Sequence, residues 1–274
     1  MPVVHHLFPR VLQSQLVPSS FRLVCKRWMS DSRGCESQRN MKFNVCIEGN
    51  IGSGKTTFLQ HFQDLRPILE VVEEPIDQWR DFGGENPLAH LYSDPKRWSF
   101  TFQSLVTLTL LKKHDHPQTK PLRVMERSLY SATYCFIENL KNSGLLADVE
   151  YNVLTGWFDF LLKQGRVSVD LIVYLQTSPQ TCFERIQTRN RPEERNITLD
   201  YLNQLHELHE RWLVKKSDRK LITPPVLIID GNKGKTDVRT SFADVKSEIL
   251  KAIPNVSSRL EDKEENTSTA MHLT

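Results

Sequence analysis

Five short apolar runs alternate along the chain with segments whose apolar residues recur at helical spacing. The runs are rich in Val and Ile and are bounded by polar or turn residues, as buried strands of a parallel sheet are. They cover residues 43–48, 69–73, 122–126, 170–175 and 226–230. The segments between them predict helices over residues 55–65, 96–113, 129–141, 149–163, 179–188 and 199–215. This alternation predicts one α/β domain, a five-stranded parallel sheet flanked by helices.

The two ends of the chain differ from this body. Residues 1–30 carry basic residues and serines, and the first acidic residue is Asp31. Such a lead is typical of a mitochondrial transit segment, with a disordered tail as the alternative for residues 1–40. Met41 directly precedes the first strand, so initiation there would give a cytosolic form. We place the domain at residues 41–254 and predict a disordered tail over residues 255–274.

Composition narrows the class of protein. The 274 residues are 39% hydrophobic and 25% charged, which is ordinary for a globular protein, and no apolar run is long enough to span a bilayer. The net charge is +3 without a dense basic run, so nothing indicates nucleic-acid binding. The five cysteines are scattered without a C-x-x-C pair. That spacing argues against a zinc site or disulfide framework and favours a reducing compartment.

A glycine-rich turn follows the first predicted strand. Residues 49–56 read GNIGSGKT, which fits the P-loop pattern G-x-x-x-x-G-K-[ST] at the start of a predicted helix. Glycines let backbone N–H groups wrap around a polyphosphate, while Lys55 would reach its terminal phosphates and Thr56 would bind Mg²⁺. The turn predicts nucleotide binding by Gly49, Asn50, Ile51, Gly52, Ser53, Gly54, Lys55, Thr56 and Thr57.

A GTP-binding protein is the first alternative. Residues 81–84 fit D-x-x-G, and Asn232-Lys233 resembles the guanine-reading N-K-x-D motif. However, Lys235 stands where an Asp should accept hydrogen bonds from guanine, and the D-x-x-G does not directly follow a strand. We interpret both matches as accidental.

Charged residues end the second and third predicted strands, in Glu73-Glu74-Pro75 and Glu126-Arg127-Ser128. Carboxyl ends of parallel strands meet at one edge of a sheet, so these groups should converge on the P-loop. Phosphoryl transfer needs a base, a cation for developing charge and a metal ligand, which Glu74, Arg127 and Glu126 can supply. Solvated strand-end charges are the alternative interpretation.

A basic segment follows the fourth strand. Its arginines run from a helix into a Pro-broken loop that also carries Glu193 and Glu194. They could close over bound phosphates as a lid, or form an ordinary salt-bridged helix end. The arginines are Arg185, Arg189 and Arg191.

Further motifs occur in order around these residues. They are the Trp79 that follows Glu-Glu-Pro, Tyr92-Ser-Asp-Pro, Phe102-Gln103-Ser, Glu126-Arg-Ser-(x)2-Ser131, Asp170-Leu-Ile-Val-Tyr-Leu and Leu205-His-Glu-Leu-His-Glu-Arg-Trp212. With the P-loop and the lid arginines, they resemble the deoxyribonucleoside kinase family, particularly its thymidine kinase branch, over residues 43–230. The resemblance implies a P-loop kinase fold with a basic lid, ATP and Mg²⁺ as cofactors, and 5′-phosphorylation of a deoxyribonucleoside in nucleotide salvage. It also implies a homodimer formed through helices such as 96–113 and the one that begins at Leu129, with burial of their apolar residues inside the domain as the alternative.

The resemblance assigns a role to each matching residue. Glu74 would be the general base for the 5′-hydroxyl, and Arg127 and Lys55 would complete the catalytic set. Thr56 and Glu126 would hold Mg²⁺, while the lid arginines would surround the phosphates. The nucleoside would contact Trp79 and Phe136 around its base, Gln103 at the base's hydrogen-bonding edge, Tyr92 and Glu194 at its 3′-hydroxyl, and a wall formed by Val106, Leu110 and Ala132.

The wall bears on specificity. Purine- and cytosine-preferring members of the family carry Arg and Asp at the positions of Leu110 and Ala132. Apolar residues there leave room for the thymine methyl group, so we predict thymidine and deoxyuridine as good substrates, deoxycytidine as usable and purines as poor. Thr133 and Gln187 depart from the family pattern, which has arginine at both places.

Two other functions stay open at this point. A nucleoside monophosphate kinase shares the fold but needs cations for the acceptor's phosphate, where this chain has the carboxylate of Glu74. A non-catalytic ATP-binding scaffold is the second alternative, and the intact set of Lys55, Glu74, Glu126 and Arg127 argues against it.

Overall fold

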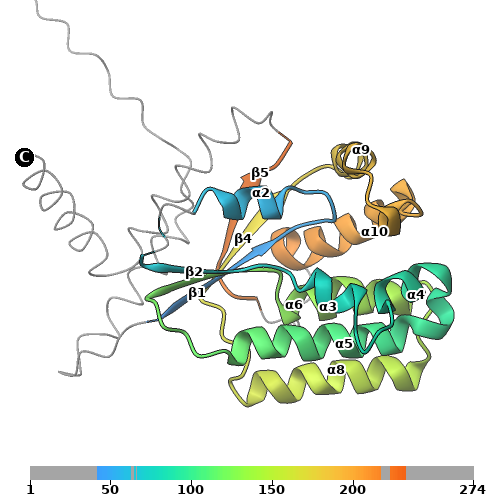
Figure 1. Cartoon of the computed structure of the whole chain (residues 1–274), viewed down its shortest axis with the longest axis horizontal. Helices are drawn as coiled ribbons and strands as arrows, with labels where there is room; N and C mark the ends of the chain where they lie inside the picture. The colour runs from blue at the N-terminus through green and yellow to red at the C-terminus, as the bar shows by residue number, and fades with distance from the viewer. Residues whose placement is uncertain (1–41, 63–64, 66, 217–222, 233–274) are drawn as a thin grey trace, which may run out of the picture. The chain divides into compact units, whose positions relative to one another are not determined.

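The computed structural model describes residues 42–62, 65, 67–216 and 223–232 (Figure 1). The predictions for residues 1–40, for Met41 as a second start and for the tail at 255–274 lie outside the described residues. The described strands form one parallel sheet in the order β2-β3-β1-β4-β5. They are β1 (Phe43–Glu48), β2 (Leu69–Val72), β3 (Leu122–Glu126), β4 (Leu171–Gln176) and β5 (Val226–Asp230). The predicted five-stranded α/β fold is confirmed.

Two strands differ slightly from their predicted bounds. β2 ends at Val72, one residue early, and β4 begins at Leu171 and not at Asp170. Asp170 is instead bound to β1 through its side chain, since its carboxylate accepts a hydrogen bond from the backbone N–H of Asn44 at 2.7 Å. Since β1 lies between β3 and β4, the P-loop follows the central strand, with the end of β3 on one side.

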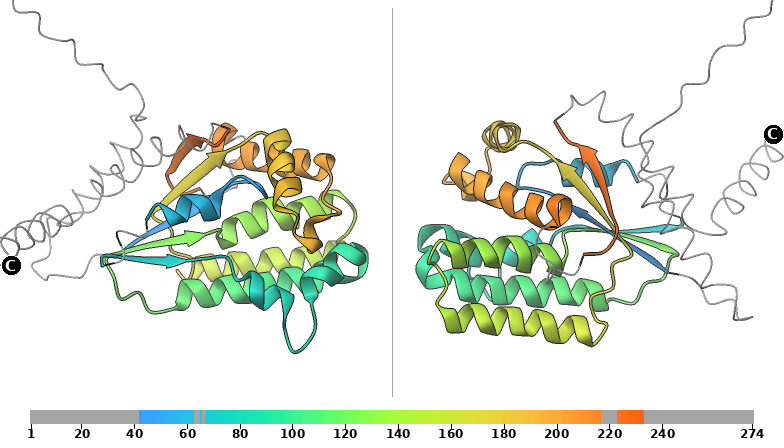
Figure 2. Two further views of the ribbon diagram at one scale, coloured as in Figure 1. Left: turned by 45° about the horizontal axis from the view of Figure 1, so that its top comes forward. Right: turned by 180° about the vertical axis from the view of Figure 1, so that it is seen from behind.

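Helices cover both faces of this sheet. The views in Figures 1 and 2 show α5 and α8 side by side, with α2 across the sheet from them. The helical segments are α2 (Lys55–Gln60), α3 (Ile76–Arg80), α4 (Pro87–Ser93), α5 (Pro95–Asp115), α6 (Leu129–Ser131), α7 (Glu138–Asn142), α8 (Asp148–Lys163), α9 (Pro179–Arg189) and α10 (Leu199–His209), with a short 3₁₀ turn η4 (Pro192–Glu194). Within the described residues, no helix combines the length and apolar character needed to cross a membrane.

The helices α3 and α4, which lie between β2 and α5, were not predicted from the sequence. The starts of α4 and α5 are nevertheless readable, because Asn-Pro and Asp-Pro pairs mark helix starts. The Asn86 side chain accepts a hydrogen bond from the N–H of Ala89 at 2.9 Å, and Asp94 does the same for Arg97 at 3.2 Å. The short helices α3 and α4 form part of the wall of the cavity described below.

The helix predicted over residues 129–141 is not a regular α-helix. It runs from α6 through a π-helical segment, η3 (Ala132–Ile137), into α7, and a second π segment, η5 (Glu210–Lys215), follows α10. Thr133 lies buried in η3 and its hydroxyl donates to the carbonyl of Leu129 at 2.9 Å. A threonine that satisfies its hydroxyl inside its own helix needs no partner elsewhere, so this departure from the family pattern has a local account.

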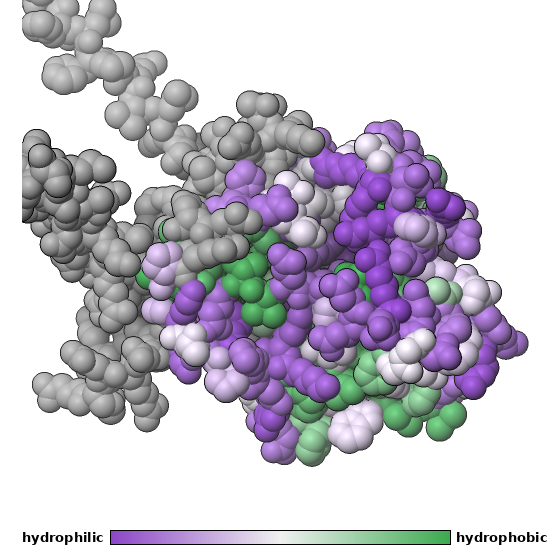
Figure 3. All heavy atoms as spheres, in the orientation of Figure 1, coloured by the Kyte–Doolittle hydropathy of each residue, from purple (hydrophilic) through white to green (hydrophobic). Residues whose placement is uncertain are grey.

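The helix that begins at Leu129, described over residues 129–142, presents no exposed large apolar side chain. Most of its apolar residues are buried in the core, where Tyr130 packs against Phe158 of α8 and stacks with Trp212. An exposed apolar row lies instead on α8, where Figure 3 shows hydrophobic side chains along the lower edge. The row consists of Val149, Val153, Trp157 and Phe160, whose exposed fractions range from 42% to 68%.

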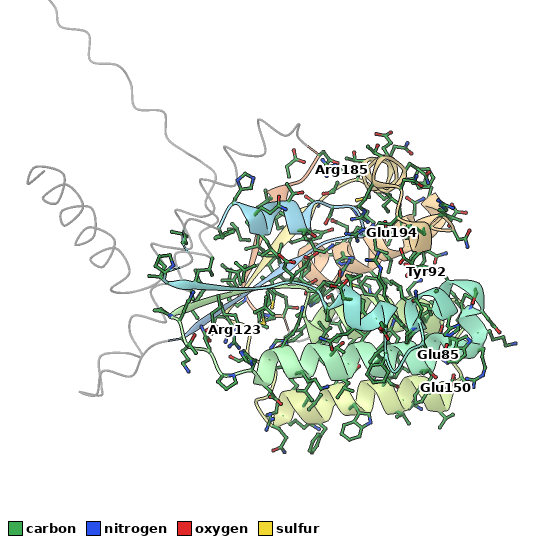
Figure 4. The ribbon with its side chains drawn as sticks, in the orientation of Figure 1. Glu85, Tyr92, Arg123, Glu150, Arg185 and Glu194 are labelled. Carbon is green, nitrogen blue, oxygen red and sulfur yellow. The ribbon has the colours of Figure 1, made fainter. Side chains whose placement is uncertain are left out.

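A charge cluster holds the edge strand β2 in place. Glu70 accepts hydrogen bonds from the Thr119 hydroxyl at 2.6 Å and from Arg123 Nε at 3.0 Å. Burial by itself raises the pKa of Glu70, but the hydrogen bonds from Thr119 and Arg123 outweigh it and lower the pKa to about 2. Figure 4 shows Arg123 well away from Tyr92 and Glu194, so this cluster serves the fold and not the cavity.

Candidate active site

A cavity of about 930 Å³ opens at the carboxyl edge of the sheet. Its walls come from the P-loop, the ends of β2 and β3, the helices α3 to α5, and the segment from α9 to η4. Figure 4 shows Arg185, Glu194 and Tyr92 in a row from α9 through η4 to α4. Every residue predicted for the site lines this cavity except Gly49 and Asn50, the first two residues of the P-loop.

The P-loop conformation depends on glycine. Gly52 and Gly54 have φ angles of +79° and +98°, which side-chain-bearing residues rarely adopt. A Cβ atom on Gly52 would also lie 2.6 Å from the carbonyl oxygen of Cys182, so the loop can pack this closely on α9 only with glycine there. Asn50 fixes the loop from the other side, because its side-chain amide donates to the carbonyl of Leu202 at 2.9 Å.

Lys55 lies inside the loop. Its Nζ donates to the carbonyl oxygens of Asn50 at 2.8 Å and Gly49 at 3.3 Å. Burial lowers the pKa of Lys55 to about 8, with the nearby positive charge of Arg127 adding to the shift. Phosphate oxygens are stronger acceptors than these carbonyls, so the ammonium group can exchange one set for the other without leaving the loop.

Glu74 and Arg127 form the charged centre of the cavity. Arg127 Nε lies 2.7 Å from Glu74 Oε1, and Arg127 Nη1 donates to the carbonyl of Gly49 at 3.1 Å. The guanidinium also lies 4.7 Å from the centroid of the Phe136 ring. Arg127 has a φ of +61°, a left-handed conformation that is uncommon outside glycine and clusters at functional sites. In this conformation the Arg127 guanidinium contacts both Glu74 and the P-loop.

Two oxygen-bearing side chains meet beside this centre. The Thr56 hydroxyl lies 3.2 Å from both carboxylate oxygens of Glu126, which β3 places next to β1. Burial raises the pKa of Glu126, and the neighbouring negative charge of Glu74 adds to that rise, while Lys55 opposes it. A carboxylate and a hydroxyl are the hard oxygen ligands that suit Mg²⁺, so the pair fits this ion.

The far end of the cavity is mainly apolar. Val106, Leu110 and Ala132 are buried there. Trp79 is held edge-on to Phe102, with ring centroids 5.7 Å apart, and its indole N–H donates to Thr109 Oγ1 at 3.0 Å. Gln103 is 3% exposed, and its carbonyl oxygen Oε1 has no hydrogen-bond partner. A buried unpaired acceptor at the wall of a cavity indicates a ligand that donates a hydrogen bond.

The lid arginines pair with protein groups. Arg185 donates to the carbonyls of Ser53 and Gly231, and Arg189 donates to both carboxylate oxygens of Glu194. Arg191 lies 3.5 Å from Glu194. The segment is therefore a salt-bridged helix end whose arginines also line the cavity, and closure over phosphates stays a prediction. Gln187 is exposed and does not line the cavity, so the loss of an arginine there removes no group from it.

Several residues that line the cavity were not predicted from the sequence. Arg80 and Glu193 form an ion pair between distant segments, which no local sequence pattern predicts. The side chains of Leu88, Leu91 and Tyr201 also line the cavity. Leu88 and Leu91 belong to α4, whose capping Asn86-Pro87 was the one available signal.

Comparison with known proteins covers this whole region. Residues 45–254 match the family described as Deoxynucleoside kinase. Thymidine kinase 2, mitochondrial, of Macaca fascicularis is 44% identical over 233 residues, 85% of this chain and 86% of that protein, and its Homo sapiens counterpart is 43% identical with the same coverage. Deoxycytidine kinase of Homo sapiens is 32% identical over 257 residues, 84% of this chain and 97% of that protein. The similarity therefore extends over the sheet and the cavity and is not confined to the P-loop.

Proposed function

The chain belongs to the deoxynucleoside kinase family and phosphorylates the 5′-hydroxyl of deoxyribonucleosides in nucleotide salvage; we propose that thymidine is its preferred acceptor and MgATP its donor. The observation that carries this proposal is the composition of one cavity. At one end lie Glu74 and Arg127 beside the P-loop, and at the other lies an apolar wall with the unpaired oxygen of Gln103.

The side chains beside the P-loop have the chemical groups that phosphoryl transfer requires. Glu74 accepts the proton of the 5′-hydroxyl, and the resulting oxygen attacks the γ-phosphorus in line while the bond to ADP breaks. Arg127 neutralises charge on the transferring group, and the N–H groups of the P-loop with Lys55 hold the phosphates. Thr56 and Glu126 would hold Mg²⁺, which supplies further charge neutralisation when bound. The lid arginines Arg185, Arg189 and Arg191 close on the phosphates.

Recognition of the base follows from the far wall. The unpaired Oε1 of Gln103 accepts a hydrogen bond from N3–H of thymine, and its amide N–H₂ donates to a neighbouring carbonyl of the base. Trp79 and Phe136 enclose the ring, and the small side chain of Ala132 leaves room for the methyl group. Tyr92 and Glu194 bind the 3′-hydroxyl from opposite segments, α4 and η4.

The other two functions fit the site less well. A nucleoside monophosphate kinase needs cations around the acceptor, whereas Glu74 puts a carboxylate there. A scaffold protein has no need for a buried arginine in a strained conformation aimed at the nucleotide.

A substrate panel tests the proposal. Protein lacking residues 1–40 is assayed for ADP release with the four deoxyribonucleosides and with thymidylate as acceptors. We expect the highest kcat/KM for thymidine, a lower value for deoxycytidine, and low values for purine nucleosides and thymidylate. A preference for deoxyguanosine over thymidine would overturn the proposed specificity.

Assembly and location belong to the same proposal. The apolar row on α8 recurs at positions i, i+4, i+8 and i+11, so its members share one helix face, and Leu108 of the adjacent α5 is also exposed. A contiguous exposed apolar face marks an interaction surface, which supports a homodimer formed through α5 and α8. The acid-free residues 1–30 support delivery to mitochondria, and Met41 supports an additional cytosolic form.

A further inference from the structure

An ion pair joins two walls of the cavity. Arg80 ends α3, and its Nε and Nη2 lie 2.7 Å and 3.1 Å from the two carboxylate oxygens of Glu193 in η4. The residues are 113 positions apart in the chain, and both line the cavity. The Arg80 side chain is 34% exposed and that of Glu193 is 14% exposed, so this is not a fully solvated surface pair. A bidentate geometry fixes the orientation of the two segments as well as their distance.

Each partner stands next to a residue of the substrate site. Trp79, directly before Arg80, is anchored to α5 by its hydrogen bond to Thr109 and lies at the base-binding end. Glu194, directly after Glu193, accepts hydrogen bonds from Arg189, one of the lid arginines. A continuous chain of bonded and hydrogen-bonded residues therefore links Trp79 at the nucleoside end of the cavity to Arg189 at the phosphate end.

The local pairs of the lid cannot make this connection. Arg189 and Arg191 reach Glu194 from five and three residues away, within one segment. Glu193 instead faces outward from that segment to α3, and its hydrogen bonds from Arg80 lower the pKa of its carboxyl group. The Glu193 carboxyl group is therefore ionised at neutral pH, as the ion pair with Arg80 requires.

We infer that Arg80 and Glu193 are positioning residues that couple nucleoside binding to closure of the lid arginines over the phosphates. Neither touches the reacting atoms. A nucleoside that fixes Trp79 also fixes α3, and through the ion pair it holds η4 and the lid in the closed arrangement. Because coupling between two binding sites is reciprocal, ATP must raise the affinity for thymidine by the same factor. This inference rests on the proposed function for the identity of the two ligands.

The test is a double-mutant cycle on Arg80→Met and Glu193→Gln, with the charge exchange Arg80→Glu/Glu193→Arg as a rescue variant. Thymidine dissociation constants are measured by calorimetry with and without a non-hydrolysable ATP analogue, together with kcat and KM. Asp115→Asn is the matched control. It breaks another bidentate arginine–carboxylate pair, with Arg166, whose members do not line the cavity.

We expect the analogue to tighten thymidine binding to the wild type about 5- to 150-fold. Each single variant should abolish most of this factor and raise KM for thymidine about tenfold, while kcat at saturation changes less than threefold. The double variant should resemble the singles, the charge exchange should recover part of the coupling, and the control should match the wild type. Thermal unfolding of each variant shows whether it is folded.

Several outcomes would overturn the inference: an uncoupled wild type, single variants with wild-type coupling, or losses that simply add in the double variant. Coupling lost equally in Asp115→Asn would also do so. A wild type that couples the two ligands but fails to phosphorylate thymidine would refute the proposed function alone, and the coupling in the variants would still decide the role of the ion pair.

Discussion

Replacing Glu74 by glutamine tests the proposed chemistry at a single atom. Glutamine keeps the length and shape of the side chain and can still accept a hydrogen bond from Arg127 Nε, which lies 2.7 Å from Glu74 Oε1. It cannot take the proton of the 5′-hydroxyl. General-base catalysis contributes about 10²- to 10⁴-fold, or about 3–5 kcal/mol of activation free energy, and this is the loss in kcat that we expect.

Binding and folding should change far less. Arg127 keeps its hydrogen bond to the carbonyl of Gly49 and its contact with Phe136, so the guanidinium is not left alone in the cavity. We expect a thymidine dissociation constant within about threefold of the wild type, and a stability loss of about 1–2 kcal/mol from the weaker hydrogen bond to a neutral amide. The loss should thus appear in kcat and not in affinity.

The assay follows ADP release with saturating thymidine and ATP, and calorimetry reports thymidine binding. Glu73→Gln is the matched control, because Glu73 is the exposed neighbour on the same strand end and should keep activity within about threefold. A loss of only a few-fold in kcat for Glu74→Gln would show that this carboxylate is not the base. Equal losses in the two variants would point to the summed negative charge at the cavity instead.

Three further predictions concern specificity, assembly and stability. Leu110→Arg combined with Ala132→Asp should lower kcat/KM for thymidine by at least tenfold, about 1.4 kcal/mol, and raise the relative activity on deoxycytidine, because a charged pair replaces the space for the methyl group; an unchanged thymidine preference in the substrate panel would contradict this. Trp157→Glu should convert dimers to monomers in sedimentation velocity, whereas Phe82→Glu, which is similarly exposed but lies off α8, should not. Glu70 has its pKa lowered from 4.5 to about 2, so its stabilising effect is present above pH 4.5 and is lost as pH falls toward 2. Glu70→Gln should therefore be less stable than the wild type at pH 7 by chemical denaturation, with the difference vanishing near pH 2; a constant difference over that range would refute the assignment.

The sequence by itself determined the features that depend on neighbours along the chain. The order of strands and helices follows from the spacing of apolar residues, and the P-loop follows from glycines, which adopt its positive φ angles without the strain that other residues would carry. The strand ends could be assigned to one edge of the sheet because all strands run parallel. Even for α4, which was not predicted, the pair Asn86-Pro87 marks the start of the helix in the sequence. Each of these features is set by interactions over a few residues.

Only the tertiary structure decided which side chains meet across the fold. The pairing of Arg80 with Glu193, the anchoring of Trp79 by Thr109 and the unpaired oxygen of Gln103 all depend on where distant segments come to lie. Two helices that are both rich in apolar residues also differ in burial. The helix that begins at Leu129 packs into the core, whereas α8 keeps a row of exposed apolar side chains. The apolar residues of a helix predict that one of its faces is buried, but they do not identify the segment that covers this face. Packing between distant segments leaves no local pattern in the sequence.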